Sequence, residues 1–165
     1  MSDFRGIWVA LVTPFCDGEV DFVALHGLVK KLLADGVAGL VVCGSTGEAA
    51  ALSEHEQLAV LDAVLQWAPP EQVIMGLCGN NLRELLAFQK TLQQRPLAGL
   101  LVPAPYYIRP SQLGLEAFFQ AVADAAIAET PQHLAGLELA ANRQRLQAIE
   151  AIQAIGVSLA GPAIP

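Results

Sequence analysis

Four short apolar stretches recur along the first three-quarters of the chain, each followed by an amphipathic segment, at intervals of about thirty residues. The four apolar stretches are Gly6–Val12, Gly39–Cys43, Val73–Cys78 and Ala98–Val102. A strand that is apolar at nearly every position is buried on both faces, as in a parallel sheet that is covered by helices. The sequence therefore predicts an α/β chain in which strands and helices alternate.

The amphipathic segments carry signals for the start and the end of a helix. They cover Asp21–Asp35, Ser53–Trp67, Asn81–Gln94 and Ser111–Ile127. Asp21 is a suitable N-cap for the first helix, and Gly36 lies just past its end. Ser53 and Glu56 have the spacing of a capping box at the start of the second, and Pro69 stops that helix.

Two architectures are built from such units, an open doubly wound sheet and a (β/α)8 barrel. Nucleotide-binding versions of the open sheet carry a glycine-rich phosphate loop after the first strand, whereas this chain has Thr13–Gly18 there. A complete barrel needs about 250 residues, and four units are evident in this chain of 165. We therefore predict a partial (β/α)8 TIM barrel over residues 1–128, followed by a divergent, mainly helical tail over residues 129–165.

Composition excludes several classes of protein. The formal net charge of −7 has the wrong sign for nucleic-acid binding. The longest apolar run, Gly36–Gly44, is about half of what a membrane span needs, and Met1–Arg5 lacks the features of a signal peptide. Cys16, Cys43 and Cys78 have no zinc or disulfide spacing, so we expect them to be small buried side chains. We expect a cytoplasmic protein without a metal, cofactor, membrane or nucleic-acid partner.

The loop Gly44–Glu48 follows the second predicted strand, and functional loops follow the carboxyl ends of strands in parallel α/β folds. In this loop Ser45 and Thr46 lie between two glycines, so the backbone can turn tightly and present N–H groups to a small anion such as a carboxylate. A solvated turn is the alternative interpretation. For Glu48, at the end of the loop, we expect a buried hydrogen bond.

Both tyrosines of the chain, Tyr106 and Tyr107, lie side by side in the loop after the fourth predicted strand. Prolines at 103, 105 and 110 restrict the backbone around them. Tyrosine hydroxyls at this position can relay protons. A buried packing pair is the alternative interpretation.

Several of these motifs together resemble one known family. In chain order they are Ala10–Phe15, Gly44–Glu48, Leu52-Ser53, Pro105–Tyr107, Pro110–Gln112 and Phe118-Phe119. Over about Phe4–Ala126 the chain resembles the N-terminal half of the dihydrodipicolinate synthase / N-acetylneuraminate lyase family. The resemblance implies a pyruvate-dependent class I aldolase, in which a lysine Schiff base with pyruvate becomes an enamine that attacks an aldehyde. In the synthase branch of the family this aldehyde is aspartate semialdehyde, and the overall similarity favours that branch. The N-acetylneuraminate lyase and sugar-acid aldolase or dehydratase branches remain open.

The resemblance also implies roles for individual residues. Thr46 and Gly47 bind the carboxylate of a pyruvate-like keto acid together with Ser45, and Ser45 and Tyr107 are the catalytic members of a proton relay. In this family the tyrosine at position 107 reaches across a dimer interface, which implies a homo-oligomer. The family's second relay tyrosine has no counterpart, because both tyrosines of this chain lie in one loop.

The lysines do not match the position of the family's nucleophile. Lys30, Lys31 and Lys90 all fall inside predicted helices, whereas the family's lysine ends the sixth strand. A Schiff-base lysine must be desolvated or placed beside a cation. We therefore expect this chain alone to be impaired or inactive as an aldolase. The alternatives are a non-enzymatic half-barrel that self-associates, and a degenerate gene product whose tail arose by deletion or a shifted reading frame.

Overall fold

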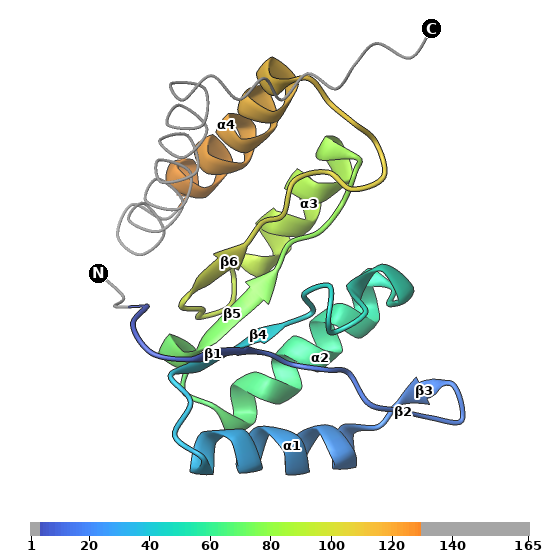
Figure 1. Ribbon diagram of the computed structural model, residues 1–165, viewed down its shortest axis with the longest axis vertical. Helices are drawn as coiled ribbons and strands as arrows, with labels where there is room; N and C mark the ends of the chain where they lie inside the picture. The colour runs from blue at the N-terminus through green and yellow to red at the C-terminus, as the bar shows by residue number, and fades with distance from the viewer. Residues whose placement is uncertain (1–3, 130–165) are drawn as a thin grey trace, which may run out of the picture.

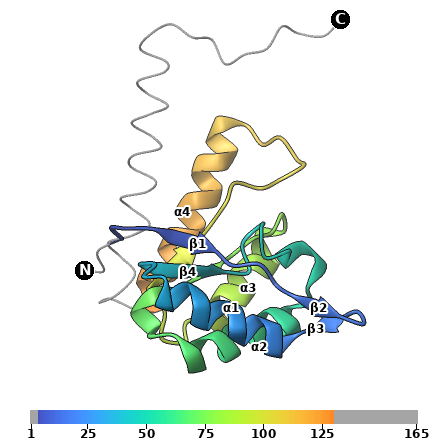
Figure 2. The same ribbon diagram turned by 60° about the horizontal axis from the view of Figure 1, so that its bottom comes forward.

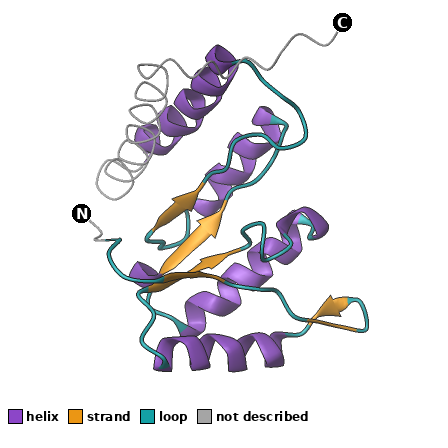
Figure 3. Cartoon of the chain, in the orientation of Figure 1, coloured by secondary structure: helices purple, strands orange, loops and turns teal. Residues whose placement is uncertain are grey.

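The computed structural model describes residues 4–129 as an alternation of strands and helices (Figures 1 and 3). The strands are β1 (Trp8–Ala10), β2 (Phe15–Cys16), β3 (Glu19–Val20), β4 (Gly39–Val42), β5 (Val73–Gly76) and β6 (Gly99–Leu101). The helices are α1 (Phe22–Ala34), α2 (Glu54–Trp67), α3 (Leu82–Leu92) and α4 (Gln112–Glu129), with short 3-10 turns at Ala49–Ala51 and Pro70–Gln72. Apart from Glu129, the predicted tail lies outside the described residues.

Four of the strands form one parallel sheet in the order β1-β4-β5-β6. Val9 lies opposite Leu40, and Met75 lies opposite Leu100. Spatial order follows chain order and a helix connects each neighbouring pair, as in consecutive units of a (β/α)8 barrel. The predicted α/β class and the partial barrel are confirmed.

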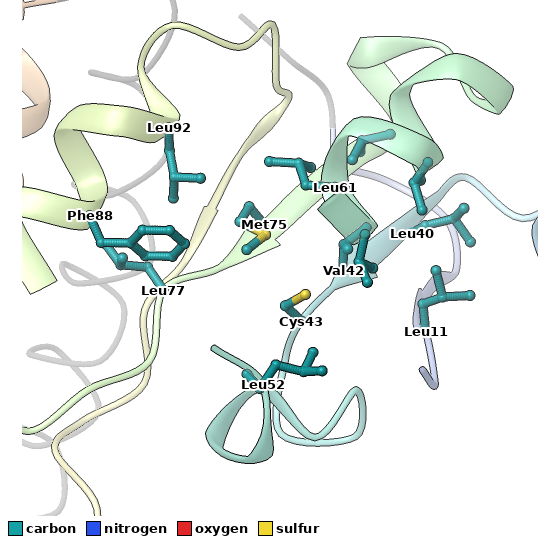
Figure 4. Packing of buried hydrophobic residues seen from close by; sticks show 14 of the residues in the cluster. Leu11, Leu40, Val42, Cys43, Leu52, Leu61, Met75, Leu77, Phe88 and Leu92 are labelled. Atoms are coloured by element: carbon teal, nitrogen blue, oxygen red, sulfur yellow. The ribbon is translucent and has the colours of Figure 1, made fainter. Parts of the chain in front are cut away.

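All four helices pack on the same face of this sheet. Strand residues that share that face belong to one buried cluster with side chains from every helix. The strand residues are Leu40, Val42, Val73 and Met75. The helix residues are Leu25, Val29, Val60, Leu61, Val64, Leu85, Phe88, Leu92, Phe118 and Val122. Figure 2 shows α1 and α2 together beneath β1 and β4, and Figure 4 shows the packing around Met75. A doubly wound sheet carries helices on both faces, so the one-sided layer favours the barrel.

The predicted helix starts are confirmed. The Asp21 carboxylate accepts hydrogen bonds from the N–H groups of Val23 at 3.0 Å and Ala24 at 2.9 Å at the start of α1. Ser53 and Glu56 make both bonds of a capping box at the start of α2. These local contacts fix where each helix begins, and therefore how long each loop at the end of a strand can be.

A small hairpin between β1 and α1 was not predicted. β2 and β3 pair in antiparallel fashion around Asp17 and Gly18, whose φ values are +52° and +85°. Positive φ at both central residues is typical of a type I′ turn, for which Asp-Gly is a preferred pair. The hairpin exposes Cys16, so the expected burial is wrong for that cysteine, whereas Cys43 is buried and Cys78 is partly buried.

None of the helices in residues 4–129 is both long and apolar enough to cross a bilayer.

Candidate functional site

The loops that follow β1, β4, β5 and β6 lie at one edge of the sheet, because the carboxyl ends of parallel strands point the same way. This edge, which we call the loop edge, carries the segments Thr13-Pro14, Gly44–Glu48, Gly79–Asn81 and Pro103–Pro110. The predicted site residues all belong to it.

A buried threonine holds the second of these loops in place. The Thr13 hydroxyl donates a hydrogen bond of 2.8 Å to the carbonyl oxygen of Gly47, and only 5% of Thr13 is exposed. Thr13 directly follows the segment that continues β1, so this bond ties the first loop to the second across 34 residues of sequence. This hydrogen bond therefore fixes the position of the loop after β4 relative to the loop after β1.

Glycine is required where the loop passes close to neighbouring backbone. A Cβ atom on Gly47 would lie 2.8 Å from the carbonyl oxygen of Leu11, and one on Gly76 would lie 2.2 Å from that of Cys43. Both distances are far shorter than a carbon–oxygen contact allows, and the obstacle in both cases is backbone that cannot rotate away. The close approach of three neighbouring strand ends therefore depends on these two glycines.

Ser45 and Thr46 are exposed at the turn of the same loop. The turn is closed by bonds from the Gly47 N–H to the Gly44 carbonyl at 3.0 Å and from the Glu48 N–H to the Ser45 carbonyl at 3.2 Å. The side chains of residues 45 and 46 consequently lie at the solvent side of the loop edge, where a ligand can reach them. Glu48 is exposed and its φ is +54°, so the expected buried hydrogen bond is wrong: its backbone turns the chain into the short 3-10 segment, and its side chain caps nothing there.

Two thiols lie beneath the loop edge. Burial raises the pKa of the Cys43 thiol to about 12, and nearby Cys78 adds to the increase. Burial also raises the pKa of Cys78. The Cys43 sulfur lies 3.9 Å from the carbonyl oxygen of Gln57, within reach of a weak S–H hydrogen bond. Both groups are neutral thiols near pH 7 and therefore poor nucleophiles.

The tyrosine loop is held by an asparagine that sequence reasoning did not single out. The Tyr106 N–H donates to Oδ1 of Asn80 at 2.9 Å, which joins the loop after β6 to the loop after β5. The Ile108 N–H donates to the carbonyl oxygen of Tyr106 at 2.8 Å, and Tyr107 between them has φ +68°. A bulky residue at this φ is strained, and such strain persists only where the surroundings hold it. The only signal for Asn80 in the sequence is its place two residues after the predicted strand Val73–Cys78.

The structure brings some of the predicted residues together and leaves others apart. Ser45, Thr46 and Gly47 form one turn, and Thr13 supports it. Tyr107 is 98% exposed and points to solvent, and within residues 4–129 its hydroxyl makes no hydrogen bond to Ser45. Tyr106 and Tyr107 are both exposed, so the alternative interpretation of these two tyrosines as a buried packing pair is wrong.

The three lysines lie on helices, away from the loop edge. Lys30 and Lys31 are exposed on α1, and Lys31 pairs with Asp35 at 2.5 Å. Lys90 is exposed on α3. Since the helices cover the outer face of the sheet, none of the three amines lies among the loops described above. The described residues also contain no cluster of three or more His, Cys, Asp or Glu side chains that could hold a metal ion.

Similarity to known proteins agrees with this arrangement. Residues 3–155 match the model of the dihydrodipicolinate synthetase family. The chain belongs to this family. It is 39% identical over 126 residues to 4-hydroxy-tetrahydrodipicolinate synthase of Desulfotalea psychrophila, which covers 76% of this chain and 42% of that protein. The crystal structure of dihydrodipicolinate synthase DapA-2 from Bacillus anthracis matches with a TM-score of 0.73 and 33% identity, over 81% of this chain and 45% of that one.

Other members of the fold family match nearly as well. A variant of Sulfolobus solfataricus 2-keto-3-deoxygluconate aldolase matches with a TM-score of 0.67 and 28% identity, over 73% of this chain and 41% of the aldolase. The chain thus spans less than half the length of the relatives that it matches.

Proposed function

We propose that this chain carries the keto-acid recognition part of a 4-hydroxy-tetrahydrodipicolinate synthase-type site and binds pyruvate or a pyruvate-like keto acid there. The observation that carries the proposal is the anchored turn Gly44–Glu48, in which the Thr13–Gly47 bond fixes the backbone and leaves Ser45 and Thr46 exposed. A carboxylate at this turn would accept hydrogen bonds from the two hydroxyls and from backbone N–H groups of the turn. Charge-assisted bonds of this kind are among the stronger hydrogen bonds in proteins.

The proposed catalytic roles follow from the chemistry of the same edge. Ser45 would pass a proton between the bound keto acid and a tyrosine hydroxyl, since a hydroxyl can donate and accept at once. Tyr107 points into solvent in a single chain, so in our proposal it completes the relay in a neighbouring copy of a homo-oligomer. The relatives named 4-hydroxy-tetrahydrodipicolinate synthase favour the synthase branch, for which the family resemblance implies aspartate semialdehyde as the aldehyde. The match to 2-keto-3-deoxygluconate aldolase keeps the sugar-acid branch as the second candidate.

The positions of the three lysines argue against imine formation by this chain. An imine with pyruvate requires a neutral amine close to the bound keto group. Lys30, Lys31 and Lys90 are exposed on the outer helices, away from the loop edge at which the keto acid is proposed to bind. We therefore infer that this chain binds the keto acid without converting it, so that its aldolase activity alone is absent or strongly impaired.

Binding and imine formation are tested separately. Titration of the ¹⁵N-labelled chain with pyruvate should shift the amide resonances of the turn Gly44–Glu48, and Thr46→Val should weaken that response by about tenfold, as expected for loss of a hydrogen bond to a charged group. Thr91→Val is the matched control, because the Thr91 hydroxyl bonds to the Phe88 carbonyl within α3. Unperturbed turn resonances at saturating pyruvate would refute the anion site.

Imine formation is measured by mass spectrometry of the intact chain. After incubation with pyruvate and borohydride reduction, the intact mass of the chain should stay unchanged. A gain equal to one reduced pyruvate, located on any of the three lysines, would contradict the inference that the chain lacks a nucleophile.

A further inference from the structure

Two residues with positive φ flank the turn at which the keto acid is proposed to bind. Cys43 directly precedes Gly44 and has φ +51°, and Glu48 directly follows Gly47 and has φ +54°. Neither is a glycine, so both are strained in the left-handed region. Such conformations persist only where the surrounding structure holds them. The bond from Thr13 fixes the carbonyl of Gly47, and the two strained ends of the turn require contacts of their own.

Gln57, in the first turn of α2, contacts the chain on both sides of this turn. Its side-chain amide donates to the carbonyl oxygen of Ala49 at 3.1 Å and to that of Leu52 at 3.2 Å. Ala49 directly follows Glu48, so these bonds fix the chain where it leaves the turn. The backbone carbonyl oxygen of Gln57 lies 3.9 Å from the sulfur of Cys43, where the chain enters the turn. One residue of α2 therefore holds both of the flanking segments.

The chemistry of a glutamine amide suits this position. The amide nitrogen carries two donor hydrogens, and two carbonyl oxygens lie within bonding distance of it. A carboxylate of the same size has no donor and would face two oxygens that repel it. The position therefore requires a donor and not merely a polar side chain.

The start of α2 determines where the Gln57 side chain lies. Ser53 and Glu56 form the capping box that begins the helix, and the Gln57 N–H donates to the Ser53 carbonyl at 2.9 Å. Gln57 is also partly buried. The support of the turn thus comes from a side chain on a rigid helix, which is the arrangement that holds a binding site in place before its ligand arrives.

We propose that Gln57 is a positioning residue for the keto-acid site. It holds the turn Gly44–Glu48 in the conformation that presents Ser45, Thr46 and backbone N–H groups to a carboxylate. This inference rests on the proposed function. Because carbonyl oxygens engage both donors of the amide, Gln57 acts through the turn and not on the ligand. A ligand binds more tightly to a site that it does not have to order first.

The first test uses the 165-residue chain without any ligand. Gln57→Met removes both donors at nearly constant size. The N–H groups of Gly47 and Glu48 close the turn, and we expect their exchange rates, measured by NMR, to rise at least tenfold in this variant. The exchange rates in β5 should not change, because the effect is local. Gln66→Met is the matched control, since Gln66 is exposed near the other end of α2, and it should alter neither set of rates.

Two further variants separate the donor from the size of the side chain. Gln57→Glu keeps the shape and loses the donors, so it should loosen the turn at least as much as Gln57→Met does. Gln57→Lys keeps a donor on a chain long enough to reach the carbonyls and should restore part of the protection. In the native chain, the side-chain amide protons of Gln57 should exchange about tenfold more slowly than those of Gln66.

Titration with pyruvate connects the turn to binding. Gln57→Met should raise the dissociation constant read from the amides of Gly44–Glu48 by about tenfold. Gln57→Lys should raise it less, and Gln66→Met should leave it unchanged. A native chain that does not respond to pyruvate would refute the keto-acid site itself. A native chain that responds, together with Gln57→Met that responds equally, would refute only the role of Gln57.

Three other results would also overturn this role. One is an unchanged exchange rate at Gly47 and Glu48 in Gln57→Met. Another is a rise of the same size in β5, which would mean that the variant destabilises the whole fold and not the turn. The third is Gln57→Glu with native protection of the turn, which would show that donation by the amide does not hold it.

Discussion

Thr13 is a buried residue whose hydroxyl donates to a single acceptor, the carbonyl oxygen of Gly47 at 2.8 Å. Replacing Thr13 with valine removes the donor and leaves that buried carbonyl without this partner, which costs about 1–3 kcal/mol. We therefore expect Thr13→Val to lower the free energy of unfolding by this amount, as measured by urea denaturation. Thr13→Ser keeps the hydroxyl and should lose clearly less. Equal losses in the two variants would mean that the methyl group, and not the hydrogen bond, matters at this position.

Cys43 gives the molecule a predictable response to alkaline pH. Burial raises the pKa of its thiol from the ordinary value of 9.0 to about 12 in the folded chain. Between these values the unfolded chain loses a proton that the folded chain keeps, so stability is complete below pH 9 and falls as the pH rises towards 12. Cys43→Ala should therefore flatten the decline in unfolding free energy between pH 8 and pH 10.5. Cys16→Ala, at an exposed position, is the control; if it flattens the profile equally, burial of Cys43 is not the cause.

At the scale of elements, the capping box of α2 is the contact most open to a direct test. The Ser53 hydroxyl accepts from the Glu56 N–H at 3.2 Å, and the Glu56 carboxylate accepts from the Ser53 N–H at 2.8 Å. Ser53→Ala should destabilise the fold by about 1 kcal/mol, and Ser53→Thr should restore most of that loss. Circular dichroism during thermal unfolding measures both changes.

The same box should weaken in acid. Hydrogen bonds from Ser53 lower the pKa of the Glu56 carboxyl, so its contribution is present above the unfolded value near 4.5 and is lost as the pH falls through the lower, folded value. The difference in stability between the native chain and Ser53→Ala should therefore shrink below about pH 4. A difference that stays constant down to pH 3 would show that the carboxylate contributes nothing to the cap.

Elements whose signals are local could be predicted from the sequence, and features that depend on distant partners could not. The bounds of α1 and α2 follow from Asp21, Ser53 and the residues beside them, which act within one turn of helix. The β2–β3 hairpin had a local signal in Asp17-Gly18, but its strands are two residues long and show no alternation of polar and apolar residues. The Thr13–Gly47 bond spans 34 residues, and only the paired strands bring its partners together.

For the whole molecule, the sequence predicted the order of strands because each apolar stretch is followed by its helix. Which face of the sheet the helices would cover, and where the tyrosine loop would point, depend on packing between units. Asn80 illustrates this, since its bond to the Tyr106 backbone joins two loops whose sequences carry no mutual signal. The hydrogen bonds that hold the loop edge in place therefore could not be predicted from the sequence.

Hydrogen exchange offers a whole-molecule prediction that separates the inner strands from the outer ones. β4 and β5 each pair on both sides, and Leu40, Val42 and Val73 are fully buried, so their amides should be strongly protected. Within the described residues β1 and β6 pair on one side only, so the outward-facing amides of these two strands have no strand partner there. Protection should therefore be lower in β1 and β6 than in β4 and β5. Mass spectrometry of peptides covering each strand measures this directly. Equal protection in all four strands would contradict the prediction and show that the outer edges are covered as well.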